Sequence, residues 1–359
     1  MEADSRRRAD WHGTVSANVG PVQPSGNRLR ATRASPPGLA FGDLDRRATY
    51  GAALQQFGEL IDAAGAIGPV SRPLPLYYAV HQAGKAIAAA WAEGEWRATG
   101  HGLSQDSREW QDDILRFRVK PQKTPGVFGI VAGTLGTARL TGRVELGALW
   151  SALPEASPPA GGDSWPLALP VYPFSNAAYP LSSEEGAGAP SWVSVCLRGQ
   201  PALVDAEAVN RLLATYPGAA DTRVTTYQGN LQFSPTPWGP GIGVMWPRTD
   251  MQEQGKPSSG GPSRFYVHDR PLAYRSGEER WLIPRVGHGS DWLSPILLWW
   301  ILLFGLSLLA RYEPVAWRAA LDLDQSPVAD PLTQLLDDAL VIVPALLFDA
   351  ATQDRGSIP

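Results

Sequence analysis

The longest apolar segment of the chain constrains its fold most. From Trp292 to Ala310 the sequence contains no charged residue, and the segment lies between Asp291 and Arg311. A stretch of this length can span a bilayer or form the central helix of a large core. Pro295, two serines, a glycine and three tryptophans at varied depths weaken membrane insertion. We therefore expect a buried core helix, and a single membrane anchor formed by residues 292–310 is the alternative.

The composition is that of a globular protein. Of 359 residues, 44% are hydrophobic and 18% are charged, which allows a sizeable core. The formal net charge of −4 gives no global basic field, so nucleic acid is a disfavoured partner. The single cysteine, Cys196, excludes an intrachain disulfide and fits a reducing compartment. The charged start, Met1–Arg8, is followed by no apolar region, unlike a secretory signal. We expect a cytoplasmic protein.

Composition and periodicity divide the chain into four parts. Residues 1–45 are rich in Arg, Ser, Pro and Gly, so we expect a disordered tail. Residues 46–116 form an N-terminal helical part, and residues 291–352 a C-terminal helical part that packs on it. Residues 117–290 form a β-rich middle with Pro/Gly-rich loops. The predicted fold class is α+β, with the N-terminal and C-terminal helices packed together in a helical bundle and the β-rich region inserted between them.

Apolar residues at helical spacing predict the helices of both ends. Tyr50–Ala64 and Leu76 to about Ala92 are predicted in the N-terminal part, where Gly84 and several alanines allow another helix to approach closely. Ser294 is the predicted cap of the apolar helix, with Pro295 in its first turn. Two more helices are predicted over Val315–Leu321 and about Val328–Ala351.

Short β-branched and aromatic runs predict the strands of the middle. They are Phe117–Val119, Val127–Val131, Ala138–Val144, Trp192–Leu197, Arg223–Tyr227, Gly243–Trp246 and Arg264–His268, with a hairpin over Tyr274–Val286.

Motifs for cofactor or metal chemistry are not found in the sequence. Lys85 lies in an Ala-Gly-Lys-Ala segment, which lacks the first glycine and the Ser/Thr of a phosphate-binding loop. The five histidines show none of the spacings of zinc sites. We therefore expect no cofactor and no metal.

A cation and an imidazole lie close together after the second predicted helix. Arg97 and His101 are separated by three residues, whereas HEPN-type ribonucleases usually place four to six between their arginine and histidine. Gly100 indicates a turn, so a histidine that hydrogen-bonds a neighbouring segment is the simpler interpretation. Arg97 and His101 remain weak catalytic candidates, and a HEPN-like ribonuclease is an alternative function.

A second polar group ends the apolar helix. Arg311, Tyr312 and Glu313 follow the apolar run directly, and Pro314 ends or bends the helix. An arginine suits a helix C-terminus, and we expect an ion pair between Arg311 and Glu313 to hold this helix against the earlier one. The alternative is that these residues line a pocket for a polar ligand.

Two blocks of the sequence together resemble YaaC-like bacterial proteins. Residues 75–87 (PLYYAVHQAGKAI) with 100–103 (GHGL) resemble the first helical block, and residues 303–317 (LFGLSLLARYEPVAW) resemble the C-terminal block. The resemblance covers roughly residues 50–350. It implies a fold and a bacterial cytosolic setting, favours burial of 292–310, and implies no reaction. The positions that carry it are Tyr78, Lys85, His101, Gly102, Arg311, Tyr312, Glu313, Pro314 and Trp317.

We expect these positions to assemble at one helix–helix junction. The expected binding residues are Tyr78, Lys85, His101, Arg311, Tyr312 and Glu313. The favoured function is a binding or scaffold role without catalysis. A protein partner or a small polar ligand fits that role, and a membrane is a less favoured partner.

Overall fold

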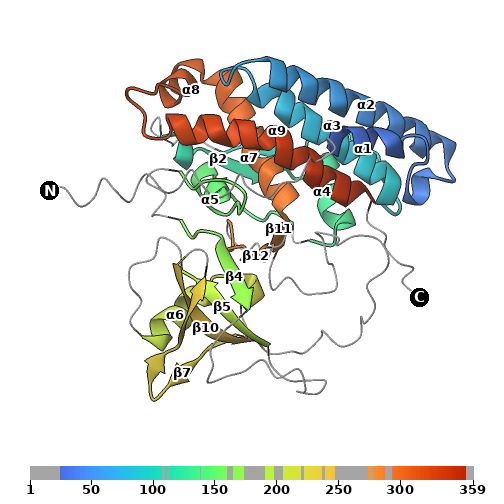
Figure 1. Ribbon diagram of the computed structural model, residues 1–359. Coiled ribbons are helices and arrows are strands. Elements are labelled where there is room, and N and C mark those ends of the chain that lie inside the picture. Colours follow the sequence, from blue (N-terminus) through green and yellow to red (C-terminus); the bar gives the residue numbers. More distant parts are fainter. Residues whose placement is uncertain are drawn as a thin grey trace.

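Helices from both ends of the chain form one lobe, and most strands form a second, smaller lobe (Figure 1). Each lobe has its own apolar core. This arrangement confirms the predicted α+β class, with helices at both ends and strands in the middle. The computed structural model describes residues 25–106, 110, 113–137, 139–159, 165–173, 191–197, 205–219, 222–236, 239–246, 274–276, 279–287 and 293–352.

Two antiparallel helices, α2 (Leu44–Ala66) and α3 (Pro73–Trp91), form one side of the helical lobe. Arg46, near the start of α2, donates hydrogen bonds of 3.0 Å to the carbonyl oxygens of Ala89 and Ala92 at the end of α3. These bonds satisfy carbonyls that a helix end leaves without an internal partner. Both predicted helices are confirmed, and each begins a few residues earlier than its periodicity indicates.

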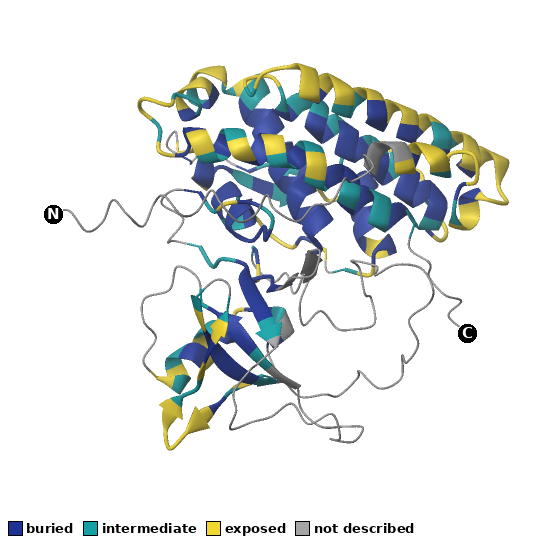
Figure 2. Cartoon of the chain, viewed as in Figure 1, coloured by how far each residue is buried: buried dark blue, intermediate teal, exposed yellow. Residues whose placement is uncertain are grey.

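The apolar segment forms α7 (Pro295–Tyr312) in the centre of this lobe. Every residue from 295 to 309 is buried, and Figure 2 shows the helical lobe with buried inner faces and exposed outer faces. The neighbours of α7 include α3, α5 (Leu146–Ser151) and α9 (Ala329–Thr352). Among the described helices, α7 alone is long and apolar enough to cross a bilayer. In this fold it is the core helix that we predicted.

The start of α7 differs in detail from the prediction. Ser294 precedes the helix and Pro295 opens it, as expected, but the Ser294 hydroxyl accepts no hydrogen bond from the first turn. That hydroxyl is buried and has no hydrogen-bond partner in the described part of the chain, and the carbonyl of Ser294 accepts from the N–H groups of Leu297 and Leu298 instead. The helix therefore begins through backbone hydrogen bonds rather than a side-chain cap.

Residues 25–45 do not belong to a loose tail, contrary to our expectation. They contain α1 (Ser25–Thr32), the 3₁₀ helix η1 (Gly38–Ala40) and the start of α2. Leu29 on α1 is buried, and α1 packs against α9. Ala40 is buried as well, and the Thr32 hydroxyl forms a 2.7 Å hydrogen bond with the Tyr50 hydroxyl on α2, so several contacts hold this segment to the helical lobe. Residues 1–24 lie outside the described part of the chain.

The first part of the predicted β-rich middle belongs to the helical lobe. A small antiparallel sheet of β1 (Leu103–Gln105), β2 (Arg118–Pro121) and β3 (Val144–Glu145) packs beneath α7. The strand predicted over Val127–Val131 is wrong, because these residues lie in the helix α4 (Gly126–Thr134). A short run of buried apolar residues fits either structure, and here it packs against α3 as a helix. Of residues 139–144, the described part of the strand predicted over Ala138–Val144, only Val144 is in a strand.

The described strands of the second lobe form an antiparallel sheet in the order β11-β12-β4-β5-β10-β6, with β9 also pairing with β10. The short helix α6 (Ala206–Leu213) buries Val209 and Leu213 in the core of this lobe. The predicted hairpin over 274–286 is confirmed by the pairing of β11 with β12. The strand predicted over Arg264–His268 lies outside the described residues. The remaining strands are β4 (Leu169–Pro173), β5 (Ser191–Cys196), β6 (Arg223–Val224), β9 (Phe233–Thr236), β10 (Gly239–Trp246), β11 (Tyr274–Ser276) and β12 (Glu279–Leu282), with a separate pair, β7 (Thr226–Tyr227) and β8 (Asn230–Leu231).

Two further helices complete the C-terminal part. The short helix α8 (Pro314–Ala320) follows α7 directly, and α9 carries Pro344 within it. Trp317 on α8 is buried, and its indole N–H donates a 2.8 Å hydrogen bond to the carbonyl oxygen of Val70. Because Val70 lies between α2 and α3, this bond joins the N-terminal and C-terminal helices.

Candidate functional site

One face of α3 carries a row of aromatic and basic side chains. Tyr77, His81 and Lys85 follow one another at four-residue spacing, so they lie one above the other on the helix surface. Tyr77 and His81 are buried, at 1% and 6% exposure, whereas Lys85 is half-buried. Tyr78 lies beside Tyr77, with 5.3 Å between the ring centroids. The row therefore runs from a buried end at Tyr77 to a more accessible end at Lys85.

The loop that carries His101 is fixed by its backbone. The N–H groups of Val127 and Phe128, in the first turn of α4, donate to the carbonyls of Gly100 and His101 at 3.0 and 3.3 Å. Gly102 has a φ of +83°, and a Cβ there would lie 1.9 Å from the carbonyl oxygen of Pro125. Only glycine tolerates both that dihedral angle and that approach. The sequence of this loop thus holds His101 in one place.

A hydrogen bond of 2.7 Å joins the Tyr77 hydroxyl to His101 Nδ1. Burial raises the pKa of Tyr77 above its ordinary value, so the phenol keeps its proton. His101 Nδ1 is the one hydrogen-bond partner of this hydroxyl among the described residues. The phenol therefore donates to Nδ1, since the opposite direction would leave its own proton without an acceptor. Neutral His101 then carries its proton on Nε2.

The imidazole of His81 packs edge-on against that of His101, with 4.7 Å between the ring centroids. Burial, assisted by His101 and by the charge of Lys85, lowers the pKa of His81 to about 3. His81 is therefore neutral at physiological pH. Its Nδ1 atom is buried and has no hydrogen-bond partner among the described residues, which is costly for a polar atom.

Two cations act on this pair of histidines. Burial and then the charges of Arg311 and Lys85 lower the pKa of His101, so both cations lie within electrostatic reach of its ring. The Arg311 charge also acts on Tyr77. We call the group of Tyr77, Tyr78, His81, Lys85, His101 and Arg311 the polar junction. It lies where α3, the His101 loop and the end of α7 meet.

Arg311 at the junction has no carboxylate partner. The ion pair that we expected between Arg311 and Glu313 is not formed, because within the described chain neither Arg311 nor Lys85 lies within ion-pair distance of an acid. Instead, Arg311 Nε donates to the carbonyl of Ser307 at 3.1 Å, and the guanidinium lies over the ring of Tyr312 at 4.9 Å. Its remaining N–H groups have no protein acceptor in the described structure.

Tyr312 and Glu313 do not join the polar junction through any contact of the described residues. Tyr312 is 61% exposed, and its contact is with the Arg311 guanidinium. Glu313 ends α7 through its backbone, since its N–H donates to Leu309 and its carbonyl accepts from Trp317. Of the six expected binding residues, the structure therefore gathers Tyr78, Lys85, His101 and Arg311.

Arg97 and His101 contact different residues. Its guanidinium pairs with Asp45 at the start of α2 and lies over the ring of Trp96 at 4.7 Å. The contacts of His101 are with Tyr77, Tyr78 and His81. No contact of the described residues joins the two side chains of the proposed HEPN pair.

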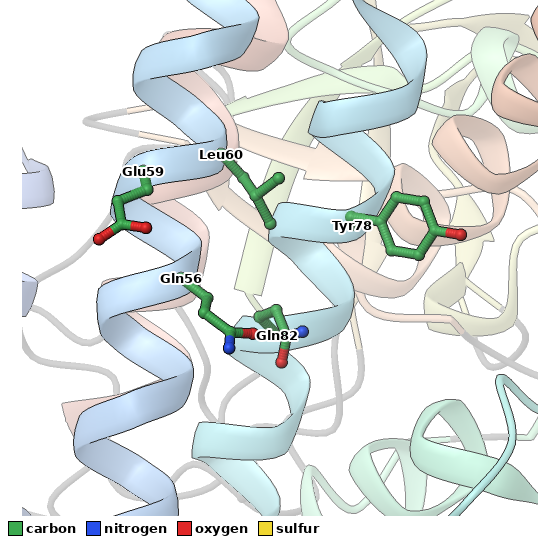
Figure 3. A pocket seen from close by; sticks show the side chains of 5 residues that line it. All are labelled: Gln56, Glu59, Leu60, Tyr78 and Gln82. Carbon is green, nitrogen blue, oxygen red and sulfur yellow. The ribbon is translucent and has the colours of Figure 1, made fainter.

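A hollow of about 370 Å³ adjoins the polar junction on the surface between α2 and α3. Figure 3 shows Gln56 and Gln82 approaching each other across it, with Leu60 above them in this view, projecting from α2 toward α3. Tyr78 borders this hollow and projects from α3 away from α2. The residues that line it are Gln56, Glu59, Leu60, Tyr78 and Gln82.

Sequence reasoning missed two members of the junction, Tyr77 and His81. The signal that could have found them is their four-residue spacing with Lys85 on the same helix face.

Among the described residues, no group of three or more His, Cys, Asp or Glu side chains could hold a metal ion.

Comparisons with known proteins give one match. No curated protein and no solved structure matches the chain. The model of the family described as YaaC-like Protein matches residues 43–351, from the start of α2 to the end of α9. This match covers most of the chain, and it includes every residue of the polar junction. The chain therefore belongs to the family of YaaC-like proteins.

Proposed function

We propose that this protein binds a small polar ligand at the polar junction and performs no catalysis there. One observation carries the proposal. Two cations, Lys85 and Arg311, act on two neutral imidazoles, and neither cation forms an ion pair with an acid of the described residues. A fold that places two positive charges beside buried rings without a counter-charge loses stability. A ligand that supplies the missing partner would recover it.

Burial of the neighbouring groups supports a preformed site. His81 and Tyr77 cannot move without disturbing α3, whose inner face is almost entirely buried. The backbone of His101 is bonded to α4, so the ring is positioned before any ligand arrives. A site that is ordered beforehand loses less conformational entropy on binding.

The two alternative functions receive less support. A HEPN-like ribonuclease needs its arginine and histidine together, and the charge of Arg97 is paired with Asp45 instead. A membrane anchor through 292–310 requires α7 to leave a core in which its residues 295–309 are buried. We accordingly propose a cytoplasmic location, which fractionation of cell extracts tests directly.

The proposed function is tested by native mass spectrometry of the protein purified from its own cells. We expect an added mass on the native protein that denaturation releases. The double variant K85Q/R311Q should lack that mass, and the matched control K123Q/R318Q, which changes two exposed cations that do not belong to the polar junction, should keep it. A wild-type protein without added mass, or a mass that K85Q/R311Q retains, contradicts the proposal. A retained macromolecule would indicate a protein partner in its place.

A further inference from the structure

The groups that the polar junction offers to a ligand are hydrogen-bond donors. Lys85 provides an ammonium group, and Arg311 provides the guanidinium N–H groups that Ser307 does not use. His101 provides Nε2–H, because the Tyr77 hydroxyl occupies Nδ1. The described residues add no carboxylate to this set. Lys85 follows His81 on the same face of α3, and the ring of His81 lies 4.7 Å from that of His101. The charges of Lys85 and Arg311 both act on His101, and neither cation is paired with an acid of the described residues.

We infer that the polar junction is an oxyanion site, and that the ligand binds through a phosphate group or a similar tetrahedral oxyanion. This inference rests on the proposed function and names the chemical class of the ligand. A phosphate group offers several acceptor oxygens around one centre, so it can accept from an ammonium, a guanidinium and an imidazole N–H together. A neutral polar ligand would leave both charges uncompensated.

The imidazole of His81 is a second polar group beside His101. His81 is 94% buried, from its 6% exposure, and within the described part of the chain its Nδ1 has no hydrogen-bond partner. Its ring lies against that of His101. In the tautomer that carries its proton on Nδ1, His81 is a further donor beside the proposed oxyanion.

Tyr77 is a positioning residue in this arrangement. Its hydroxyl fixes the tautomer of His101, so that the proton of the neutral ring is on Nε2, the nitrogen that the Tyr77 hydroxyl leaves free for another partner. In Y77F the ring can carry the proton on either nitrogen. We expect the affinity for the oxyanion to fall a few-fold in Y77F, with little loss of folded protein because Phe keeps the ring contact with Phe304.

The test is a titration of the purified full chain with inorganic phosphate. Binding is measured by calorimetry and by the change in the thermal midpoint of unfolding. Sodium chloride at matched ionic strength removes general salt effects. We expect saturable binding of phosphate to wild-type protein, roughly tenfold or more weaker binding in K85Q and in R311Q, and unchanged binding in K123Q/R318Q. Circular dichroism of each variant confirms that it is folded.

Two additional measurements sharpen the result. Imidazole ¹⁵N chemical shifts should report the Nε2–H tautomer of His101 in wild-type protein and a mixture in Y77F. Titration with glucose 6-phosphate and with glucose separates a free anion from a phosphorylated carrier. Tighter binding of glucose 6-phosphate than of phosphate indicates a carrier, and equal binding indicates the free anion; both support the site.

The inference is overturned if phosphate does not bind saturably, if K85Q/R311Q binds it as wild-type protein does, or if His101 carries its proton on Nδ1. Binding of glucose as tightly as glucose 6-phosphate would also refute the inference. Failure of the oxyanion inference can be told apart from failure of the proposed function. If K85Q/R311Q loses a co-purified ligand, the proposed binding function stands even when no oxyanion binds.

Discussion

Gly84 on α3 lies directly against Trp300 on α7, so closely that a Cβ on Gly84 would stand 2.0 Å from Cη2 of the indole. Trp300 cannot turn aside easily, because its ring packs edge-on against both His81 and Phe128. The absence of a side chain at residue 84 therefore sets how near the two central helices approach.

Gly84→Ala should destabilise the protein. Alanine favours a helix more than glycine does, but the added methyl group overlaps the indole of Trp300, and overpacking costs about 1–3 kcal/mol or more. Chemical denaturation measures the change in the free energy of unfolding. Gly51→Ala is the matched control, since a Cβ at Gly51 in α2 meets nothing within 4 Å and should stabilise by about 0.5–1 kcal/mol. Equal effects at the two positions would contradict the close approach.

Gly102→Ala should lower the free energy of unfolding by more than the strain of a positive φ alone would cause. Both Gly102 and Gly94 have positive φ, at +83° and +69°, but only Gly102 faces a backbone oxygen, that of Pro125. We expect a loss of about 1–2 kcal/mol in Gly94→Ala and several kcal/mol in Gly102→Ala. Urea unfolding of both variants gives the comparison. Similar losses would mean that the His101 loop can move away from Pro125.

His81 should make the protein less stable as the pH falls. The folded-state pKa of His81 is lowered to about 3, below the ordinary value of 6.5, so the unfolded chain binds a proton that the folded chain excludes. The contribution is complete above pH 6.5 and is lost progressively down to about pH 3, by up to about 5 kcal/mol. We expect His81→Gln to show a shallower fall in unfolding free energy over this window. Parallel pH profiles for the two proteins would contradict the burial of a neutral imidazole.

Arg72 should contribute more to stability than a surface arginine. It donates to the carbonyls of Ala64 and Ile67 at the end of α2 and pairs with Asp337 on α9, with only 11% of its side chain exposed. Arg72→Met removes these bonds together, and we expect a loss of about 2 kcal/mol, less than for a fully buried pair because Asp337 is half-exposed.

Arg30 is the control for Arg72. Its pair with Asp62 has 52% and 71% of the two side chains exposed, so Arg30→Met should cost no more than about 1 kcal/mol. Thermal and urea unfolding of both variants decide the matter. An equal loss would show that the bonds of Arg72 to the backbone add nothing beyond a surface charge pair.

The sequence predicted the helices better than the short strands. The periodicity of α2, α3 and α9 extends over several turns, so packing of one apolar face leaves a clear signal. The structure of residues 127–131 was predicted wrongly, because four apolar residues and a glycine fit a strand and a buried helix equally. Residues 25–45 are polar in composition, and the burial of Leu29 and the packing of α1 against α9 are tertiary contacts that this composition does not reveal.

The candidate site was predicted in part. Lys85, His101 and Arg311 could be selected because they lie in the two sequence blocks that resemble YaaC-like proteins, and in the fold the charges of Lys85 and Arg311 both act on His101. The contact of His101 with Tyr77 and His81 could not be read from the chain. It depends on the loop at Gly100–Gly102 returning from the end of α3 to its beginning, which backbone hydrogen bonds to α4 enforce.

By itself, the sequence determined that a long uncharged run must leave water, and that amphipathic helices from both ends were available to cover it. Local composition carries this information, because burial of apolar surface depends on residue type and spacing. Only the tertiary structure decided that Arg311 would have no acidic partner and that His81 would be buried beside His101. Such properties depend on which groups from distant segments meet, and an electrostatic environment exists only once the chain has folded.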